Sequence, residues 1–362
     1  MKMPTDRIRE EIQREGLISF ARFMELALYC PETGYYESQK DTVGRGGDFI
    51  TSVSVGNLFG ELLAVQFAEW LETLKMDSPA LKIVEAGAHD GKLAADILSW
   101  LLLHHPGLLE QVEYCILEPS PRRQTWQKET LARFDQYTRW FTSLEDLATQ
   151  NPNLTGIIFG NELLDAFPMH RFGWNAQKKN WFEWAVTIEK DKLVWTQIAA
   201  SHPSISSQIT SALLDVLPDN YTIEVSPAAE NWWHTAARSL ARGKLLAIDY
   251  GFTDTEMFSP ARTRGTLRAY HRHRVSDDLL ANPGEQDLTA HVNFSAIQRA
   301  GESAGLKTDV FYTQPQFLTR ILEKAHKQGQ FQQLTPKQIR QFQTLTHPDH
   351  LGRAFNVLVQ SR

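Results

Sequence analysis

One stretch of the chain decides the fold, Leu81-Lys-Ile-Val-Glu-Ala-Gly-Ala-His-Asp-Gly-Lys-Leu-Ala-Ala-Asp-Ile-Leu98. Within it, a short apolar run typical of a β-strand ends at Glu85, and a turn containing Gly87 and Gly91 follows. A helical pattern begins directly after the turn. A strand, a glycine turn and a helix in this order are typical of the opening of a nucleotide-binding α/β sheet, where backbone N–H groups and the helix N-terminus meet the ligand.

The spacing of the two glycines indicates the kind of ligand. Gly87 and Gly91 form a G-x-x-x-G turn, which differs from the G-x-G-x-x-G turn that cradles the pyrophosphate of a dinucleotide. An acid, Glu85, stands just before the turn. S-adenosylmethionine has no pyrophosphate, but it has a ribose and a cationic amino-acid end. The turn therefore favours S-adenosylmethionine, although such a turn alone is a weak motif because any α/β protein can place glycine there.

A second predicted strand, residues 112–118, also ends in an acid. Glu118 stands at its tip, and Pro119-Ser-Pro121 opens the next helix. A carboxylate at this point can accept hydrogen bonds from both ribose hydroxyls of an adenosine cofactor. The alternative is that Glu118 caps the helix, because acids favour helix N-termini. The two roles are compatible with each other.

Two further apolar strands lead into polar residues. The first ends in Asn161, Glu162 and Asp165, and the second, which begins at Lys244, ends in Asp249. Ligands bind at the carboxyl ends of the strands in open α/β sheets. We therefore expect these side chains to lie on the same sheet edge as the glycine turn.

Together these residues resemble the MidA-like class I methyltransferases, whose mitochondrial member methylates an arginine of a respiratory complex I subunit during assembly. The resemblance implies a Rossmann-like sheet with helices on both faces, bound S-adenosylmethionine, and transfer of a methyl group to an arginine side chain of a protein. The matching segments follow the family's order along nearly the whole chain: Gly47-Asp-Phe-Ile-Thr-Ser52 with Leu58-Phe-Gly-Glu61, Glu85 to Leu93, Leu117-Glu-Pro-Ser-Pro121, Asn161-Glu-Leu-Leu-Asp-Ala-Phe-Pro168, Ile248-Asp-Tyr-Gly251, Gly265-Thr-Leu-Arg268 and Asp287-Leu-Thr-Ala-His-Val-Asn-Phe294.

The chain departs from the family pattern at two places. The family's turn usually reads G-P-G-R-G, whereas His89 replaces the middle glycine here. The family's T-S-P-E-I-S run corresponds to Thr51-Ser-Val-Ser-Val-Gly56, which lacks the proline and the acid. The imidazole of His89 either crowds the methionine end of the cofactor or points away from it. The missing acid concerns substrate handling more than cofactor binding.

The resemblance and the chemistry of methyl transfer assign a role to each candidate residue. A guanidinium stays protonated near neutral pH, so carboxylates must hold it while the methyl group arrives. We expect Glu162 and Asp165 to do this, with Asn161 near the sulfonium. The predicted cofactor residues are Glu118 for the ribose, Glu85, Gly87 and Gly91 for the methionine end, and Asp48 and Thr51 as a cover.

Other interpretations of the same residues stay open. Glu162 is also compatible with a helix cap, and Asp165 with an ion pair to a nearby arginine. The chain is likewise compatible with a small-molecule methyltransferase, or with a non-catalytic assembly factor that has kept the fold. The basic run from Arg262 to Arg274 is either a partner-binding loop or a solvated loop.

Composition sets broader limits. The chain has 362 residues, 42% of them hydrophobic, and a net charge of -6, which gives no support for nucleic-acid binding. The two cysteines have no metal-binding spacing, and the histidine pairs have no third ligand at a matching spacing, so we predict no metal site. No run approaches the roughly 18 apolar residues of a membrane span. The N-terminus has acids and no apolar core, so we predict a cytoplasmic protein.

The order of the patterns predicts the organisation of the chain. We expect an N-terminal helical cap over residues 1–80 and a methyltransferase core over residues 81–362, with an antiparallel β insertion at about 169–199. The run 354–360 is predicted as a final, antiparallel edge strand. The partner we expect is a protein substrate, with a respiratory-complex subunit as the specific candidate, and a homodimer is compatible with the sequence.

Overall fold

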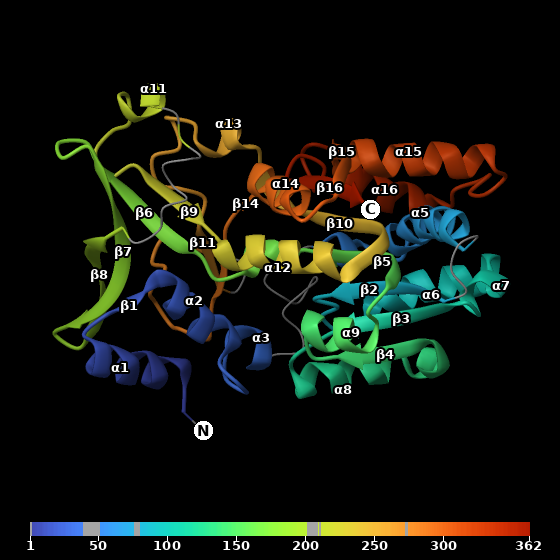
Figure 1. The fold of residues 1–362 in the computed structure, drawn as a ribbon, viewed down its shortest axis with the longest axis horizontal. Coiled ribbons are helices and arrows are strands. Elements are labelled where there is room, and N and C mark those ends of the chain that lie inside the picture. Colours follow the sequence, from blue (N-terminus) through green and yellow to red (C-terminus); the bar gives the residue numbers. More distant parts are fainter. Residues whose placement is uncertain (1, 39–50, 76–79, 201–208, 210, 272–273) are drawn as a thin grey trace.

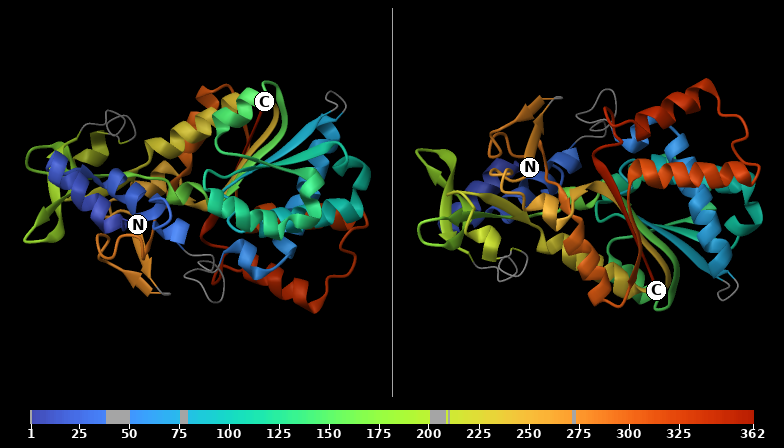
Figure 2. Two further views of the ribbon diagram at one scale, coloured as in Figure 1. Left: turned by 90° about the horizontal axis from the view of Figure 1, so that it is seen from below. Right: turned by 90° about the horizontal axis from the view of Figure 1, so that it is seen from above.

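The computed structural model describes residues 2–38, 51–75, 80–200, 209, 211–271 and 274–362 (Figure 1). Two regions lie next to each other along the longest axis of the molecule (Figures 1 and 2). One is built around a large, mostly parallel sheet, and the other around a smaller antiparallel sheet. The N-terminal helices belong to the second region and the C-terminal strand belongs to the first.

The large sheet forms the predicted α/β core. The main strands of this sheet, in spatial order, are β15 (Lys307–Thr313), β16 (Phe355–Ser361), β10 (Leu240–Phe252), β5 (Leu154–Asn161), β2 (Leu81–Ala86), β3 (Val112–Leu117) and β4 (Thr138–Phe141). Strands β2, β3, β4, β5 and β10 run parallel to one another. The short β14 (Val292–Asn293) pairs with the end of β10.

The final strand is antiparallel as predicted, but its predicted edge position is wrong. Strand β16 lies between β10 and β15, so β15 is the edge strand on this side. The apolar run Val357-Leu-Val359 of β16 is buried on both faces of the sheet. A continuous apolar run of this kind is typical of an interior strand and does not suit an exposed edge.

Helices cover both faces of the large sheet, as predicted. Alternate residues of each strand point to opposite faces, so Ile83 belongs to one hydrophobic core and Val84 to the other. The helices on the Ile83 face include α5 (Leu58–Leu74), α6 (Lys92–His104), α15 (Gln314–Lys327) and α16 (Pro336–Thr346). The helices on the Val84 face are α9 (Leu144–Gln150), α12 (Pro227–Ser239) and α14 (Phe294–Ser303).

The second region contains the predicted antiparallel segment and several strands that the sequence patterns missed. Helices α1 (Pro4–Glu15) and α2 (Phe20–Tyr29) pack against its sheet. That sheet consists of β1 (Ile18–Ser19), β7 (Asn180–Glu189), β6 (His170–Asn175), β9 (Thr222–Val225) and β8 (Lys192–Ala199). A separate three-stranded sheet consists of β12 (Arg274–Ser276), β11 (Arg268–His271) and β13 (Asp287–Thr289).

The predicted helical cap is distributed over both regions. Helices α1 and α2 lie in the second region, whereas α5 packs within the core of the large sheet. The division of the chain at residue 80 stays a prediction.

The strand register brings the polar ends to one edge. Ala86 lies beside Leu117 on one side and Gly160 on the other, and Gly160 lies beside Ala247. The residues that follow these positions therefore leave the sheet at the same edge, as expected from the sequence.

Candidate active site

A cavity of about 880 Å³ lies at the carboxyl edge of the large sheet, where the two regions meet. The glycine turn and the end of β3 border one part of it, and α9 adds residues there. The turn after β5, helix α2, the short helix α3 (Tyr35–Ser38) and strands β11 and β13 border the other part. Of the predicted site residues, the cavity brings together Thr51, Glu85, Gly87, Glu118, Asn161, Glu162 and Asp165.

Two predicted residues are not placed in the cavity wall. Asp48 lies outside the described residues. Gly91 has a φ of 83° and precedes α6, and a Cβ there would lie 3.4 Å from the Cα of Gln127. Gly91 therefore shapes the turn and its packing against α8 (Pro121–Thr130) instead of bordering the cavity.

Gly87 leaves room for a side chain of the protein itself. Its φ is 75°, and a Cβ would come within 2.9 Å of Cδ1 of Leu163. A Cβ on Gly160 would meet the same side chain at 2.7 Å. Leu163 therefore packs against both glycines and joins the cofactor turn to the turn after β5. The glycine spacing alone did not indicate this contact.

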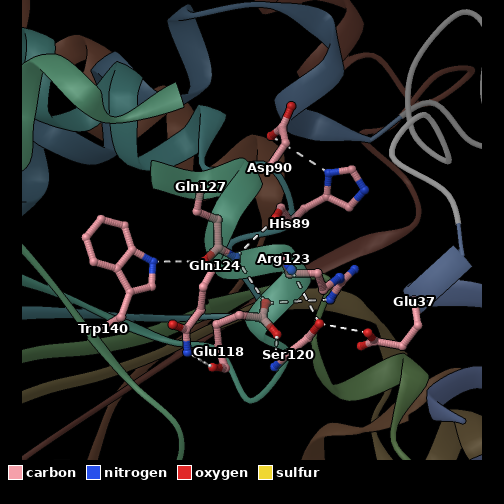
Figure 3. A network of polar contacts seen from close by, with 9 residues as sticks. All are labelled: Glu37, His89, Asp90, Glu118, Ser120, Arg123, Gln124, Gln127 and Trp140. Atoms are coloured by element: carbon pink, nitrogen blue, oxygen red, sulfur yellow. Dashed lines mark hydrogen bonds and ion pairs between the residues drawn. The ribbon is translucent and has the colours of Figure 1, made fainter. Parts of the chain in front are cut away.

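His89 adopts the left-handed conformation that glycine usually supplies, with a φ of 47°. Its Nδ1 lies 3.8 Å from Oδ1 of Asp90, and Figure 3 shows the two side chains facing each other. Its carbonyl oxygen accepts a hydrogen bond from Gln127 Nε2 at 3.1 Å. The chain thus keeps the shape of the turn although the middle residue carries a ring.

Glu118 lies at the centre of the polar network in Figure 3. Its Oε1 accepts from the N–H of Ser120 and its Oε2 from Gln127 Nε2, both at 3.0 Å. Arg123 Nη1 lies 3.8 Å from Oε2. Burial raises the pKa of Glu118, and the nearby Arg123 opposes that effect. Ser120, not Glu118, is the side chain that caps α8, because its Oγ accepts from the N–H of Arg123.

Glu85 is almost fully enclosed, with 2% of its surface exposed. The hydroxyl of Tyr114 donates to its Oε2 at 2.6 Å. Burial raises the pKa of Glu85 to about 7, although the tyrosine opposes that shift. A carboxylate next to the glycine turn is thus fixed by a partner on the neighbouring strand.

The end of β5 and the turn after it carry the three predicted catalytic residues. Glu162 has a φ of 50°, and the 3-10 turn η2 (Leu164–Ala166) follows it. Glu162 Oε1 accepts from Asn161 Nδ2 and from the N–H of Ser52, both at 3.2 Å. The N–H of Ser52 belongs to the short helix α4 (Ser52–Val55), so Glu162 contacts that helix instead of capping η2.

Asn161 carries a buried acceptor that has no partner within the described residues. Its side chain is 9% exposed and lines the cavity, and its Oδ1 accepts no hydrogen bond there. A buried polar atom without a partner is costly unless a ligand or water satisfies it. The ammonium group of a cofactor's amino-acid end is a donor of the required kind.

Acids surround Asp165. Burial is the main cause that raises its pKa well above the ordinary value, and the negative charges of Asp249, Asp287 and Glu162 add to it. Burial and Asp249 raise the pKa of Glu162 to about 8. Among the described residues, none of the arginines forms an ion pair with Asp165, which differs from the alternative suggested by the sequence. This arrangement is suited to receive a cation.

Two tyrosines from the N-terminal segment complete this part of the cavity. The Tyr29 hydroxyl donates to the carbonyl oxygen of Ala166 at 2.9 Å, and the Tyr36 hydroxyl donates to Asp287 Oδ1 at 2.8 Å. The two rings lie 5.6 Å apart between centroids. No role was predicted for Tyr29, Tyr36 or Asp287, because residues 36 and 287 are far apart in the sequence and only the fold brings them together.

His291 also lines the cavity. Its ring stacks on Phe252 with 4.5 Å between centroids. Burial, with Arg262 and Arg268, lowers its pKa to about 4, so the imidazole is neutral near neutral pH.

Thr51 caps α4 by accepting from the N–H of Ser54 at 3.2 Å. In the described ranges, neither a metal-holding group of His, Cys, Asp and Glu nor a helix able to cross a membrane occurs.

Comparison with known proteins shows which family the chain resembles. The sequence profile of a family of S-adenosyl-L-methionine-dependent methyltransferases matches residues 62–312. The protein arginine methyltransferase NDUFAF7, mitochondrial, of Danio rerio is 29% identical over 96% of this chain and 84% of its own length. The Homo sapiens protein of the same name is 29% identical over 96% of this chain and 80% of its own length.

Two solved structures share the whole fold. A protein from Burkholderia thailandensis, crystallised with bound S-adenosyl-homocysteine, has 31% sequence identity and a TM-score of 0.85, covering 99% of this chain and 92% of that one. A native crystal structure of a protein from the same organism has 29% identity and a TM-score of 0.82, with 99% and 91% covered.

Proposed function

The chain belongs to the family of S-adenosylmethionine-dependent methyltransferases, and we propose that it methylates an arginine side chain of a protein. The observation that carries the proposal is the acid-lined part of the cavity around Glu162 and Asp165. The names of the relatives, which are protein arginine methyltransferases, support it.

One half of the cavity fits the cofactor. We define this cofactor half by Glu85, Gly87, Glu118 and Asn161. Bound S-adenosylmethionine supplies a methyl group on a sulfonium. Each carboxylate oxygen of Glu118 has a further lone pair for a ribose hydroxyl beside its present partner. The unpartnered Oδ1 of Asn161 can accept from the ammonium group.

The acceptor half is defined by Tyr29, Tyr36, Glu162, Asp165 and Asp287. A guanidinium is a planar fork of donors that pairs with carboxylates in fixed geometry, whereas an ammonium is a compact point charge. Two carboxylates from one turn suit the planar group. An arriving cation lowers the raised pKa of Glu162 and favours its ionised form.

The carboxylates also provide an acceptor for the proton that the arginine nitrogen releases during methyl transfer. Methyl transfer forms a bond between an arginine nitrogen and the methyl carbon, breaks the bond from sulfur to that carbon, and releases one proton from the nitrogen. The bound guanidinium keeps Glu162 ionised, so its carboxylate is a suitable acceptor for this proton, and burial favours the protonated form once the charge of the sulfonium is gone. Glu162 thereby orients the acceptor and then takes up the proton.

The test is transfer of a radiolabelled methyl group to protein extract, followed by acid hydrolysis and separation of the amino acids. We expect label in methylarginine with the wild type and with the control Glu189→Gln, which changes an exposed acid on β7. Glu162→Gln should reduce labelling by about 100-fold or more while calorimetry shows unchanged S-adenosylmethionine affinity.

Other outcomes would contradict one part of the proposal or another. Label in another amino acid would reject arginine as the acceptor, and label only in small molecules would favour a small-molecule methyltransferase. Cofactor binding without any transfer would favour the non-catalytic assembly factor. Equal labelling by Glu162→Gln would remove Glu162 from the mechanism.

The substrate protein, the oligomeric state and the location are finer questions. We propose a respiratory-complex subunit as the protein substrate, on the basis of the family resemblance. A homodimer and a cytoplasmic location stay predictions. The relatives are named mitochondrial, so fractionation of the source cells is the measurement that decides the location.

A further inference from the structure

Asp249, at the end of β10, holds the turn that follows the neighbouring strand β5. Its Oδ2 accepts hydrogen bonds from the backbone N–H groups of Leu163 at 3.1 Å and Leu164 at 2.8 Å, with the N–H of Asp165 at 3.4 Å. Its Oδ1 accepts from the N–H of Tyr250 at 2.8 Å. The side chain is 1% exposed and does not border the cavity.

The turn needs such support because its backbone is unusual. Glu162 takes a left-handed conformation that residues other than glycine rarely adopt. Three successive N–H groups of the turn then point to one place, which is an arrangement that binds an anion. Asp249 supplies the accepting oxygen from within the protein: burial raises its pKa to about 7, and the N–H groups of the turn oppose that rise and favour the ionised form.

Leu163 secures the same turn through its side chain. It fills the room left by Gly87 and Gly160, while Asp249 binds its backbone. The turn is therefore held by a buried carboxylate and by apolar packing. Both contacts fix residues between Glu162 and Asp165.

We propose that Asp249 is a positioning residue for methyl transfer, which keeps Glu162 and Asp165 directed into the acceptor half without touching the acceptor. The inference rests on the proposed function only in naming the acceptor as arginine. A shift of about 1 Å in catalytic groups can cost about 100-fold in rate. The turn is short, and Asp249→Asn removes the charge behind these hydrogen bonds and one of the two accepting oxygens, so we expect a shift of that order.

The negative charge of Asp249 gives a second readout. The groups that act on Glu162 are Asp249 from β10, the N–H of Ser52 from α4 and the side chain of Asn161 at the end of β5. Asp165 and Tyr250 titrate nearby, and because the pKa of Asp249 is about 7, Asp249 is ionised where Glu162 titrates. Asp249 opposes the ionisation of Glu162, so removing its charge lowers the pKa of Glu162. The acid limb of the pH–rate profile should then move to lower pH.

The experiment compares Asp249→Asn with Glu183→Gln. Glu183 is a matched control because it is also 1% exposed and lies outside the cavity wall, but it bonds to His170 in the antiparallel sheet. We expect Asp249→Asn to lower kcat for an arginine-containing protein about 100-fold and to move the acid limb to lower pH. Its calorimetric affinity for S-adenosylmethionine should stay within about threefold. Glu183→Gln should change the melting temperature with little effect on kcat or the pH profile.

A second variant keeps the test decisive if Asp249→Asn does not fold. Leu163→Ala releases the turn from its apolar side, and we expect a kcat loss of about tenfold. Wild-type kcat and pH profile in a folded Asp249→Asn protein, or wild-type kcat in Leu163→Ala, would overturn the inference. If the wild type labels an amino acid other than arginine, the proposed function fails. The role of Asp249 is then measured with that acceptor.

Discussion

The cofactor half of the cavity comes largely from two strand–turn–helix units that are continuous in the sequence, whereas the acceptor half is assembled from separate segments. Glu85 and Gly87 follow one strand and Glu118 follows the next. Tyr36 and Asp287, by contrast, meet across 251 positions of the chain. A cofactor that is the same throughout a family can be met by local motifs, while the acceptor is met by surfaces that only the completed fold creates.

Leu163 is one of the contacts that connect the two halves, and the largest expected effect comes from Gly87→Val, which disturbs it. A valine at this position would have to adopt a backbone φ of 75°, and its side chain would collide with Leu163. We expect a stability loss of about 1–3 kcal/mol, and loss of both cofactor affinity and transfer by at least about 100-fold. Calorimetry and labelling measure the two halves separately. A folded variant with normal affinity and activity would contradict the connection.

The next effect should be confined to the cofactor half. Glu118→Ala removes a carboxylate that is suited to ribose hydroxyls, which should weaken S-adenosylmethionine binding about tenfold to a hundredfold, equivalent to about 1.5–3 kcal/mol. Glu113→Gln is the control on the same strand, because Glu113 pairs with Lys82 and Arg139 outside the cavity wall. If Glu118→Ala binds the cofactor normally, Glu118 serves only the network in Figure 3.

A smaller effect should be confined to the acceptor half. Tyr36→Phe removes the hydrogen bond to Asp287 and keeps the ring. Loss of about 1 kcal/mol should raise KM for the protein acceptor roughly fivefold, with cofactor affinity unchanged. Tyr312→Phe, on strand β15, is the control. A parallel loss of cofactor affinity would show that the two halves are not separable at Tyr36, where Arg123 lies over the ring.

The smallest effect concerns how the free energy of unfolding changes with pH. The pKa of Glu162 is raised from 4.5 to about 8, so the folded protein keeps a proton there that the unfolded chain has released. The stability that this group contributes is complete below pH 4.5 and is lost as the pH rises through about 8. Urea unfolding between pH 5 and 8 should therefore show a smaller decline for Glu162→Gln than for the wild type. The same decline in both would contradict the raised pKa.

The sequence predicted what depends on local pattern. Apolar runs ending at Glu85 and Glu118 located two strands and their polar tips, because a buried strand and the turn after it leave a continuous signature. The structure also places Asn161, Glu162 and Asp165 at the expected edge. Their roles stay predictions that the experiments above decide.

The remaining features lacked a local signature. The contact of Leu163 with two glycines depends on how two turns pack, and the bonds of Asp249 depend on the register of β10 beside β5. The interior position of β16 follows from the return of the chain after α15 and α16, which the spacing of apolar residues does not encode. Short strands such as β9 and β11 were missed because four residues carry too little periodicity.

The place of β16 has a consequence for the nascent chain. Strand β10 ends beside the turn that carries Glu162, and its residues 244–250 find their second neighbour only in residues 355–361. At synthesis rates of about 5–20 residues per second, the ribosome needs roughly 5–20 seconds to travel from Asp249 to that strand. Until then one edge of β10 is unpaired, and an exposed edge of this kind readily pairs with other strands. The bonds of Asp249 to the turn after β5 need only β5 and β10 and can form early, whereas the far edge of β10 is covered by β16 only late in translation.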